Sequence, residues 1–139
     1  MIQRNKLIIK EITRPYDEGE EYDKKLDNLL NKIESFSRIR TKRIHLLVAY
    51  YFLGEELKKS IDPKQTWNLF AKERKRKNAR YDYKAADRIF QLFQQVGMDQ
   101  IYHTSSLSAH IIYKLNKKDF DFLLEDAKSF QDMAKDIEL

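Results

Sequence analysis

The sequence predicts an all-α protein, a compact bundle of five to six helices preceded by a short extended N-terminal arm. Apolar residues recur every three to four positions over most of the chain, which is the period of an amphipathic helix. Only 3 Gly and 2 Pro occur among 139 residues, fewer than the many turns of a β-sandwich or barrel need. With 42% hydrophobic residues, the chain is long enough and apolar enough to bury a core of its own.

We expect residues 1–21 to form an arm and an acidic loop, and residues 22–139 to form a single helical domain. The segment from Lys6 to Ile12 is short and rich in β-branched residues, which is typical of an edge strand or an extended arm. Pro15 ends this segment, and the acidic run around Gly19 predicts a loop.

The rest of the chain divides into helices by its apolar spacing. The first is predicted from Tyr22 to Phe36. The second runs from about Ile39 to Lys59, is apolar nearly all round and therefore central, and is stopped by Pro63. The later helices are predicted from Lys64 into residues 72–80, from Tyr83 to Val96 with Gly97 as cap, from Ser106 to Leu115, and onward from a cap at Asn116. The residues expected in the core include Trp67, Phe70, Ala71, Ala86, Ile89, Phe90, Phe93 and Phe120.

Several classes of protein are disfavoured. The chain has no cysteine, which excludes disulfides and thiol nucleophiles. The longest apolar run, Leu46 to Leu53, is far too short to cross a membrane, so we expect a cytoplasmic protein with no membrane partner. His45, His103 and His110 lack the spacing of a metal site, and no Gly-rich phosphate loop or hydrolase motif occurs. We therefore expect no enzymatic activity, no cofactor and no metal.

Charge is distributed unevenly along the chain. The net charge is +5, but residues 38–80 carry 13 basic and 4 acidic side chains, a balance of +9. Residues 119–139 carry 2 basic and 7 acidic side chains, a balance of −5. A strongly basic middle segment is typical of a protein that binds a polyanion, although long cationic side chains also serve simply to solvate a helix.

Two basic segments, 38–43 and 72–84, are the candidate nucleic-acid site. Cations on a protruding segment suit phosphate contacts, and the second segment precedes an amphipathic helix as in a helix–turn–helix. The outer face of that helix carries Arg88, which can address guanine, and Gln91, which can address adenine. The full set of candidate residues is Arg38, Arg40, Lys42, Arg43, Lys72, Arg74, Lys75, Arg76, Lys77, Arg80, Tyr83, Lys84, Arg88 and Gln91.

Four short motifs extend this interpretation. They are Gly54-Glu55-Glu56-Leu57, Trp67-Asn68-Leu69-Phe70, Ala85-Ala86-Asp87-Arg88-Ile89-Phe90 and Ser106-Leu107-Ser108. Together, over residues 50–115, they resemble the helical DNA-binding domains of plasmid and phage proteins. The resemblance implies a helix–turn–helix whose second helix carries Ala, then an Arg and an aromatic. The sequence departs from that pattern in one respect, because the connection expected over residues 72–82 is long and contains no Gly.

The sequence thus favours a non-enzymatic protein that binds nucleic acid, above all duplex DNA, with homodimerisation as for other readers of paired half-sites. Abundant Lys, Asn, Ile, Tyr and Phe also suit the AT-rich genome of a virus or plasmid. Two alternatives stay open. One is a protein–protein interaction module, or a self-assembling protein, whose basic face docks an acidic partner. The other is a single-stranded nucleic-acid binder in which Tyr81 and Tyr83 stack on bases.

Overall fold

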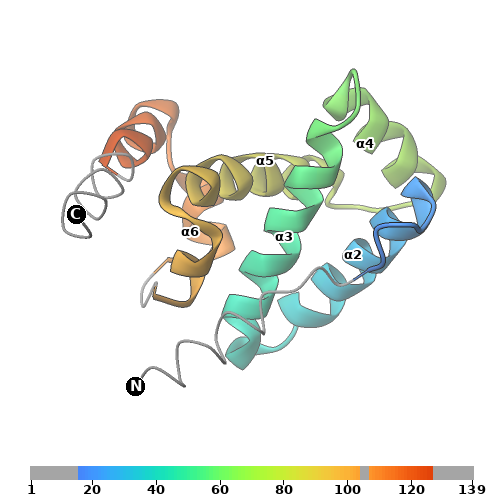
Figure 1. Cartoon of the computed structure of the whole chain (residues 1–139), viewed down its shortest axis with the longest axis horizontal. Coiled ribbons are helices and arrows are strands. Elements are labelled where there is room, and N and C mark those ends of the chain that lie inside the picture. The colour runs from blue at the N-terminus through green and yellow to red at the C-terminus, as the bar shows by residue number, and fades with distance from the viewer. Residues whose placement is uncertain (1–15, 104–106, 127–139) are drawn as a thin grey trace.

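A computed structural model describes residues 16–103 and 107–126 of the chain. The expected arm before residue 16, the expected start of the fifth helix at Ser106 and the end of the acidic tail lie outside these residues. The described residues form helices and no strand, which confirms the all-α prediction (Figure 1).

The helices occur along the chain in the predicted order. They are α2 (Tyr22–Ser37), the 3-10 helix η1 (Arg40–Lys42), α3 (Arg43–Lys58), α4 (Pro63–Glu73), α5 (Ala79–Val96), the 3-10 helix η2 (Met98–His103) and α6 (Ala109–Lys114). Residues 117–126 are also helical.

The two central helices are α3 and α5, which cross each other and share the most extensive contact in the described part of the chain (Figure 1). On one side α2 packs against α3, and α4 and α6 both pack against α5. The crossing of α3 and α5 is close because Gly54 has no side chain. A Cβ built on Gly54 would lie 2.5 Å from the carbonyl oxygen of Ala86, so only glycine permits this approach.

Most of the core prediction is confirmed. Trp67 is fully buried, Phe70 and Ala71 are nearly so, and Ile89 and Phe93 are covered on the inner face of α5. Nearly every residue in the centre of α3 is buried, as expected for a helix that is apolar all round. The caps at Gly97, with φ of 109°, and at Asn116, whose Oδ1 accepts from the Asp119 amide at 2.8 Å, are also confirmed.

Some boundaries differ from the prediction. The second helix begins at Arg43, after a 3-10 turn, and ends at Lys58 without help from Pro63. Pro63 instead occupies the first turn of α4, where its missing amide proton costs nothing, and the side chain of Asp62 caps that helix by accepting from the Gln65 amide at 3.1 Å. The fifth helix begins at Ala109, because the side chain of Ser108 caps it.

The largest correction is that α5 begins at Ala79, a full turn before the predicted Tyr83. The indole Nε1–H of Trp67 donates to the carbonyl of Ala79 at 2.9 Å, which fixes the start of α5 against α4. The connection between α4 and α5 is therefore only residues 74–78, and Lys75 supplies its sharp bend with φ of 55°.

A buried ion group fastens α2 to the end of α3. The carboxylate of Glu56 is fully buried, and the ammonium groups of Lys25 (3.4 Å) and Lys59 pair with it. The hydroxyl of Tyr22 donates to the main-chain carbonyl of Glu56 at 3.1 Å. Burial raises the pKa of Tyr22, and the negative charge of Glu56 adds to that effect. The helical period of the sequence gives no indication of this group.

Candidate nucleic-acid interface

The connection between α4 and α5 lies against α2, and two of its arginines make that contact. Arg74 donates to both carboxylate oxygens of Asp27, with Nη2 to Oδ2 at 2.8 Å, and its guanidinium lies 3.7 Å from the centroid of the Phe70 ring. The hydrogen bond from Arg74 lowers the pKa of Asp27 and raises that of Arg74 itself.

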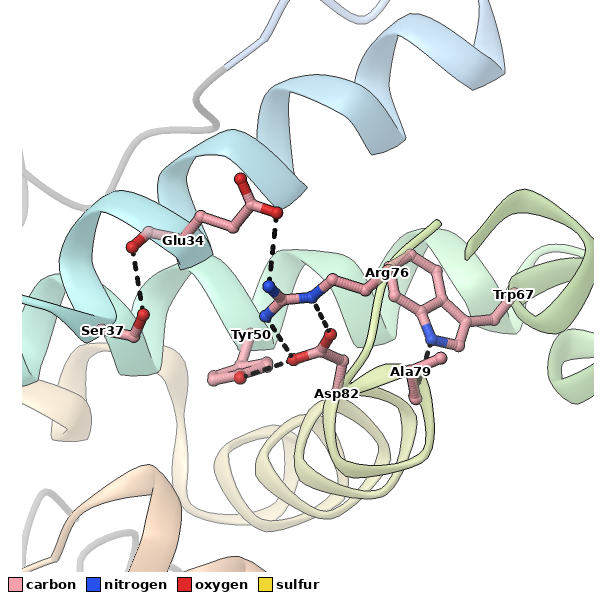
Figure 2. Close-up of polar contacts among 7 residues, drawn as sticks. All are labelled: Glu34, Ser37, Tyr50, Trp67, Arg76, Ala79 and Asp82. Atoms are coloured by element: carbon pink, nitrogen blue, oxygen red, sulfur yellow. Dashed lines mark hydrogen bonds and ion pairs between the residues drawn. The ribbon is translucent and has the colours of Figure 1, made fainter. Parts of the chain in front are cut away.

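Arg76 lies in a second, more deeply buried network (Figure 2). Its Nε and Nη2 donate to the two carboxylate oxygens of Asp82 at 2.7 and 3.3 Å, and its Nη1 donates to Glu34 at 3.3 Å. Asp82 is fully buried in the first turn of α5, and it also accepts a hydrogen bond of 2.9 Å from the hydroxyl of Tyr50 on α3. Burial, followed by the charge of Asp82, raises the pKa of Tyr50 far above its usual range.

The prediction places Arg88 on an outer face where it could address a base, whereas in the structure its guanidinium is held against α6. Its Nη1 donates to the carbonyls of Ile112 (3.0 Å), Tyr113 (3.2 Å) and Leu115, at the C-terminal end of α6. Its guanidinium also lies 4.8 Å from the ring centroid of Phe120. These carbonyls have no partner within α6 and carry its negative dipole end, so a cation stabilises them. Arg88 therefore joins α5 to α6.

Three other candidates are also partly covered. Gln91 donates from Nε2 to Asp87 at 2.9 Å, and Asp87 in turn pairs with Lys58 at 3.0 Å. Arg43 donates to the carbonyl of Leu107, which fixes the start of α3 beside the segment that leads into α6. Tyr83 lines a small hollow with Lys58 and Asp87.

Half of the candidate residues remain exposed. They are Arg38, Arg40, Lys72, Lys75, Lys77, Arg80 and Lys84. Lys42 is partly covered. In the second segment, Arg74 and Arg76 pair with acidic residues and hold the fold together, as Arg88 does farther along α5. Arg80 and every lysine of that segment project into solvent.

One stripe of α5 faces outward between α6 and the start of α4. Arg80 and Lys84 lie on it one turn apart and are exposed, and Gln91 follows after two more turns. Gln94 and Gln95 extend the exposed surface toward the end of the helix. The predicted outer face therefore exists, but it is narrower than expected and Arg88 lies at its covered edge.

The two basic segments approach one another at the end of α2. Glu34, which accepts from Arg76, lines a surface hollow together with Arg38 and Ile39. Figure 2 shows Arg76 of the α4–α5 connection meeting Glu34 close to Ser37, where α2 ends. The first basic segment begins with Arg38, the next residue of the chain.

The structure also assembles three aromatic rings that sequence reasoning did not join. Tyr81 on α5 lies 4.3 Å from Tyr113 and 6.1 Å from His110, measured between ring centroids, and both partners are on α6. The i, i+3 spacing of His110 and Tyr113 could have indicated that pair, but the contact with Tyr81 spans about thirty residues of chain. Lys84 Nζ lies 4.8 Å from the centroid of the Tyr113 ring.

The described residues show neither a metal site nor a membrane-spanning helix. Among residues 16–103 and 107–126, no group of three or more His, Asp or Glu side chains is placed to hold a metal ion. No helix in the described part of the chain is long and apolar enough to span a bilayer. Comparison with models of protein families, with curated proteins and with solved structures found no match to this chain.

Proposed function

We propose that this protein binds duplex DNA and catalyses no reaction. The observation that carries the proposal is the exposure of four cationic side chains close together in the chain, those of Lys75, Lys77, Arg80 and Lys84, which we take as the DNA-binding surface. These side chains project from a five-residue connection and from the outward stripe of the helix that follows it. Cations on a bend followed by an outward-facing helix suit contacts along a phosphate backbone.

The proposed mode of binding follows from which cations are exposed and which are held within the fold. Because Arg88 is held by the carbonyls of α6, few side chains remain that could read base edges. Phosphate contacts carry no sequence information, so we infer binding that is strong at low salt and only weakly selective for sequence. Arg80, Lys84 and Gln91 are the residues whose position would permit any selectivity.

The test is the salt dependence of binding after charge removal. In the variant K75Q/K77Q/R80Q, up to three phosphate contacts are lost. The slope of log affinity against log salt should then become shallower by up to about 2.7, at roughly 0.9 per contact. Affinity should fall by a similar factor for every duplex tested in a mobility-shift assay.

A matched control removes the same charge elsewhere. Lys24 on α2, Lys64 on α4 and Lys118 are exposed and lie outside the proposed surface. The variant K24Q/K64Q/K118Q should keep nearly the full slope. Equal slopes for the two triple variants would show that net charge alone is responsible and would overturn the proposed site. Absence of duplex binding at low salt would instead favour the interaction module.

A further inference from the structure

The aromatic cluster of Tyr81, His110 and Tyr113 lies beside the proposed DNA-binding surface. The ring planes of Tyr81 and His110 are 21° apart, and those of His110 and Tyr113 are 26° apart. Tyr81 and Tyr113 are half-buried against the core, whereas His110 is exposed. His110 is thus the most exposed ring of the three. Its plane lies close to that of each tyrosine, although the two tyrosine planes are 42° apart, and its Nδ1 lies 3.5 Å from the Tyr81 hydroxyl.

The surroundings of the cluster are cationic. The ammonium of Lys84 lies over the Tyr113 ring, and Lys114 is exposed beside it in the same helix. The sequence of α6, AHIIYK, contains no carboxylate. The nearest carboxylate on α5, that of Asp82, is buried and already pairs with Arg76. An exposed aromatic ring among cations suits a nucleobase with its attached phosphate.

Lys84 belongs to both surfaces, since it lies on the outward stripe of α5 and over the cluster. Within a duplex, away from its ends, a paired base has both faces covered by its neighbours, so there only an unpaired base can stack on His110. We infer that the cluster is a stacking platform for one unpaired base next to the duplex. On this view, which rests on the proposed DNA binding, the preferred ligand is a duplex that ends in, or is interrupted by, a short single-stranded stretch.

The experiment compares a blunt duplex with the same duplex carrying a short thymine overhang, on either the 3′ or the 5′ strand, in a mobility-shift assay. One stacked base should make at least one of the overhang duplexes bind about fivefold more tightly than the blunt duplex. The overhanging thymine should also be protected from permanganate, which attacks the exposed face of an unstacked thymine.

Variants at position 110 test the platform without disturbing the buried tyrosines. H110A should abolish the overhang preference and the permanganate protection while leaving blunt-duplex affinity within about twofold of the wild type. H110W, which offers a larger ring, should retain or increase both. The control is H45A, because His45 is also exposed and in contact with one aromatic ring, that of Phe36 at 5.5 Å. H45A should keep the preference.

The outcomes separate the two proposals. If the wild type binds blunt and overhang duplexes equally, or if H110A keeps the preference, the platform is wrong while the duplex site stands on its salt slope. A single strand that binds more tightly than either duplex would overturn the inference as well, because the platform would not need an adjoining duplex. If the wild-type protein binds none of these DNAs, the proposed function itself is contradicted.

Discussion

Arg88 shows how a side chain that suits a base in the sequence acquires a different role in the fold. A guanidinium presents several N–H donors in one plane, and the end of a helix presents several carbonyls without partners. The end of α6 offers three such carbonyls to Arg88. These acceptors lie more than twenty residues away in the chain, so helical spacing alone could not reveal them.

Replacing Arg88 should therefore affect stability and not recognition. We expect R88A to lower the free energy of unfolding by about 2 kcal/mol, because the carbonyls of α6 lose a charged donor. The midpoint of urea unfolding measures this loss. The ratio of affinities for a preferred and a random duplex should not change. Q94A, at an exposed position of the same helix, should alter stability by less than about 0.5 kcal/mol. A stable R88A variant with altered sequence preference would restore Arg88 as a reader.

The buried hydroxyl of Tyr50 should make the protein less stable at high pH. Its hydroxyl donates to buried Asp82, and its pKa is raised above the ordinary value of 10.0. Above about pH 10 the unfolded chain releases this proton while the folded chain retains it. The stabilisation is therefore complete below pH 10 and is lost as pH rises, at up to about 1.4 kcal/mol per pH unit for this one group.

Urea unfolding at several pH values above neutrality measures the effect. The Y50F variant should be less stable at neutral pH, by about 1–3 kcal/mol, because Asp82 loses one buried hydrogen bond. Its stability should then decline less steeply than that of the wild type beyond pH 10, by close to one proton. Parallel curves for the two proteins would contradict the assignment of this proton to Tyr50.

At the scale of the elements, the helical period was sufficient to predict the all-α class, the order of the helices and most of the core. Trp67, Phe70, Ile89 and Phe93 are buried as their spacing indicates. The start of α5 could not be found in this way. It depends on the hydrogen bond from Trp67 to Ala79 and on the pairing of Arg76 with Asp82, which are contacts between elements and not properties of a periodic pattern.

The candidate site was predictable to a similar degree. Lys75 and Lys77 are exposed, as expected for lysines of a protruding basic segment. Which arginines would be neutralised could not be predicted, because Asp27 and Glu34 are 47 and 42 residues away from Arg74 and Arg76. The ring cluster was missed for the same reason, since it forms only when α6 folds onto α5.

The close crossing of α3 and α5 gives a prediction at this scale. G54A should destabilise the fold by about 1–3 kcal/mol, because the added methyl group meets the Ala86 backbone and the helices must separate. This loss should appear although alanine favours a helix more than glycine does. G19A is the matched control, because nothing lies within 4 Å of a Cβ at Gly19. Equal unfolding midpoints for G54A and the wild type would show that the helices can separate at no cost.

Across the whole molecule, some cations are paired with acidic residues inside the fold, and others are left exposed. The +9 charge balance of residues 38–80 is partly neutralised, because two arginines of this segment pair with acidic residues outside it. Arg74 pairs with Asp27, and Arg76 pairs with Asp82 and Glu34. What remains for a partner is the set of exposed cations at the α4–α5 connection and along α5. The net attraction for DNA is consequently weaker than the composition of the segment alone would indicate.

A DNA duplex that binds the folded protein but not the unfolded chain should raise the melting temperature of the protein. A short duplex at about 100 times its Kd should stabilise the fold by about 2.7 kcal/mol, which corresponds to roughly 5–10 °C for a chain of this size. Calorimetry with a duplex that melts above the protein measures this shift. The shift should shrink as salt is added, because screening weakens exposed charges. A shift that does not depend on salt would argue against phosphate contacts.

Trp67 is the only tryptophan in the sequence, and its position makes it an optical reporter of the site. The indole is fully buried, and its ring centroid lies 5.5 Å from that of Phe70, on which it stacks. It donates to the carbonyl of Ala79, where α5 begins, and the guanidinium of Arg74 covers the Phe70 ring. Its fluorescence emission should be that of a dry, hydrogen-bonded indole. If DNA draws the connection away from α2, Arg74 and Ala79 move first, and the emission changes in both intensity and wavelength. The protein thus carries an intrinsic probe for events at its basic surface, and no dye need be attached.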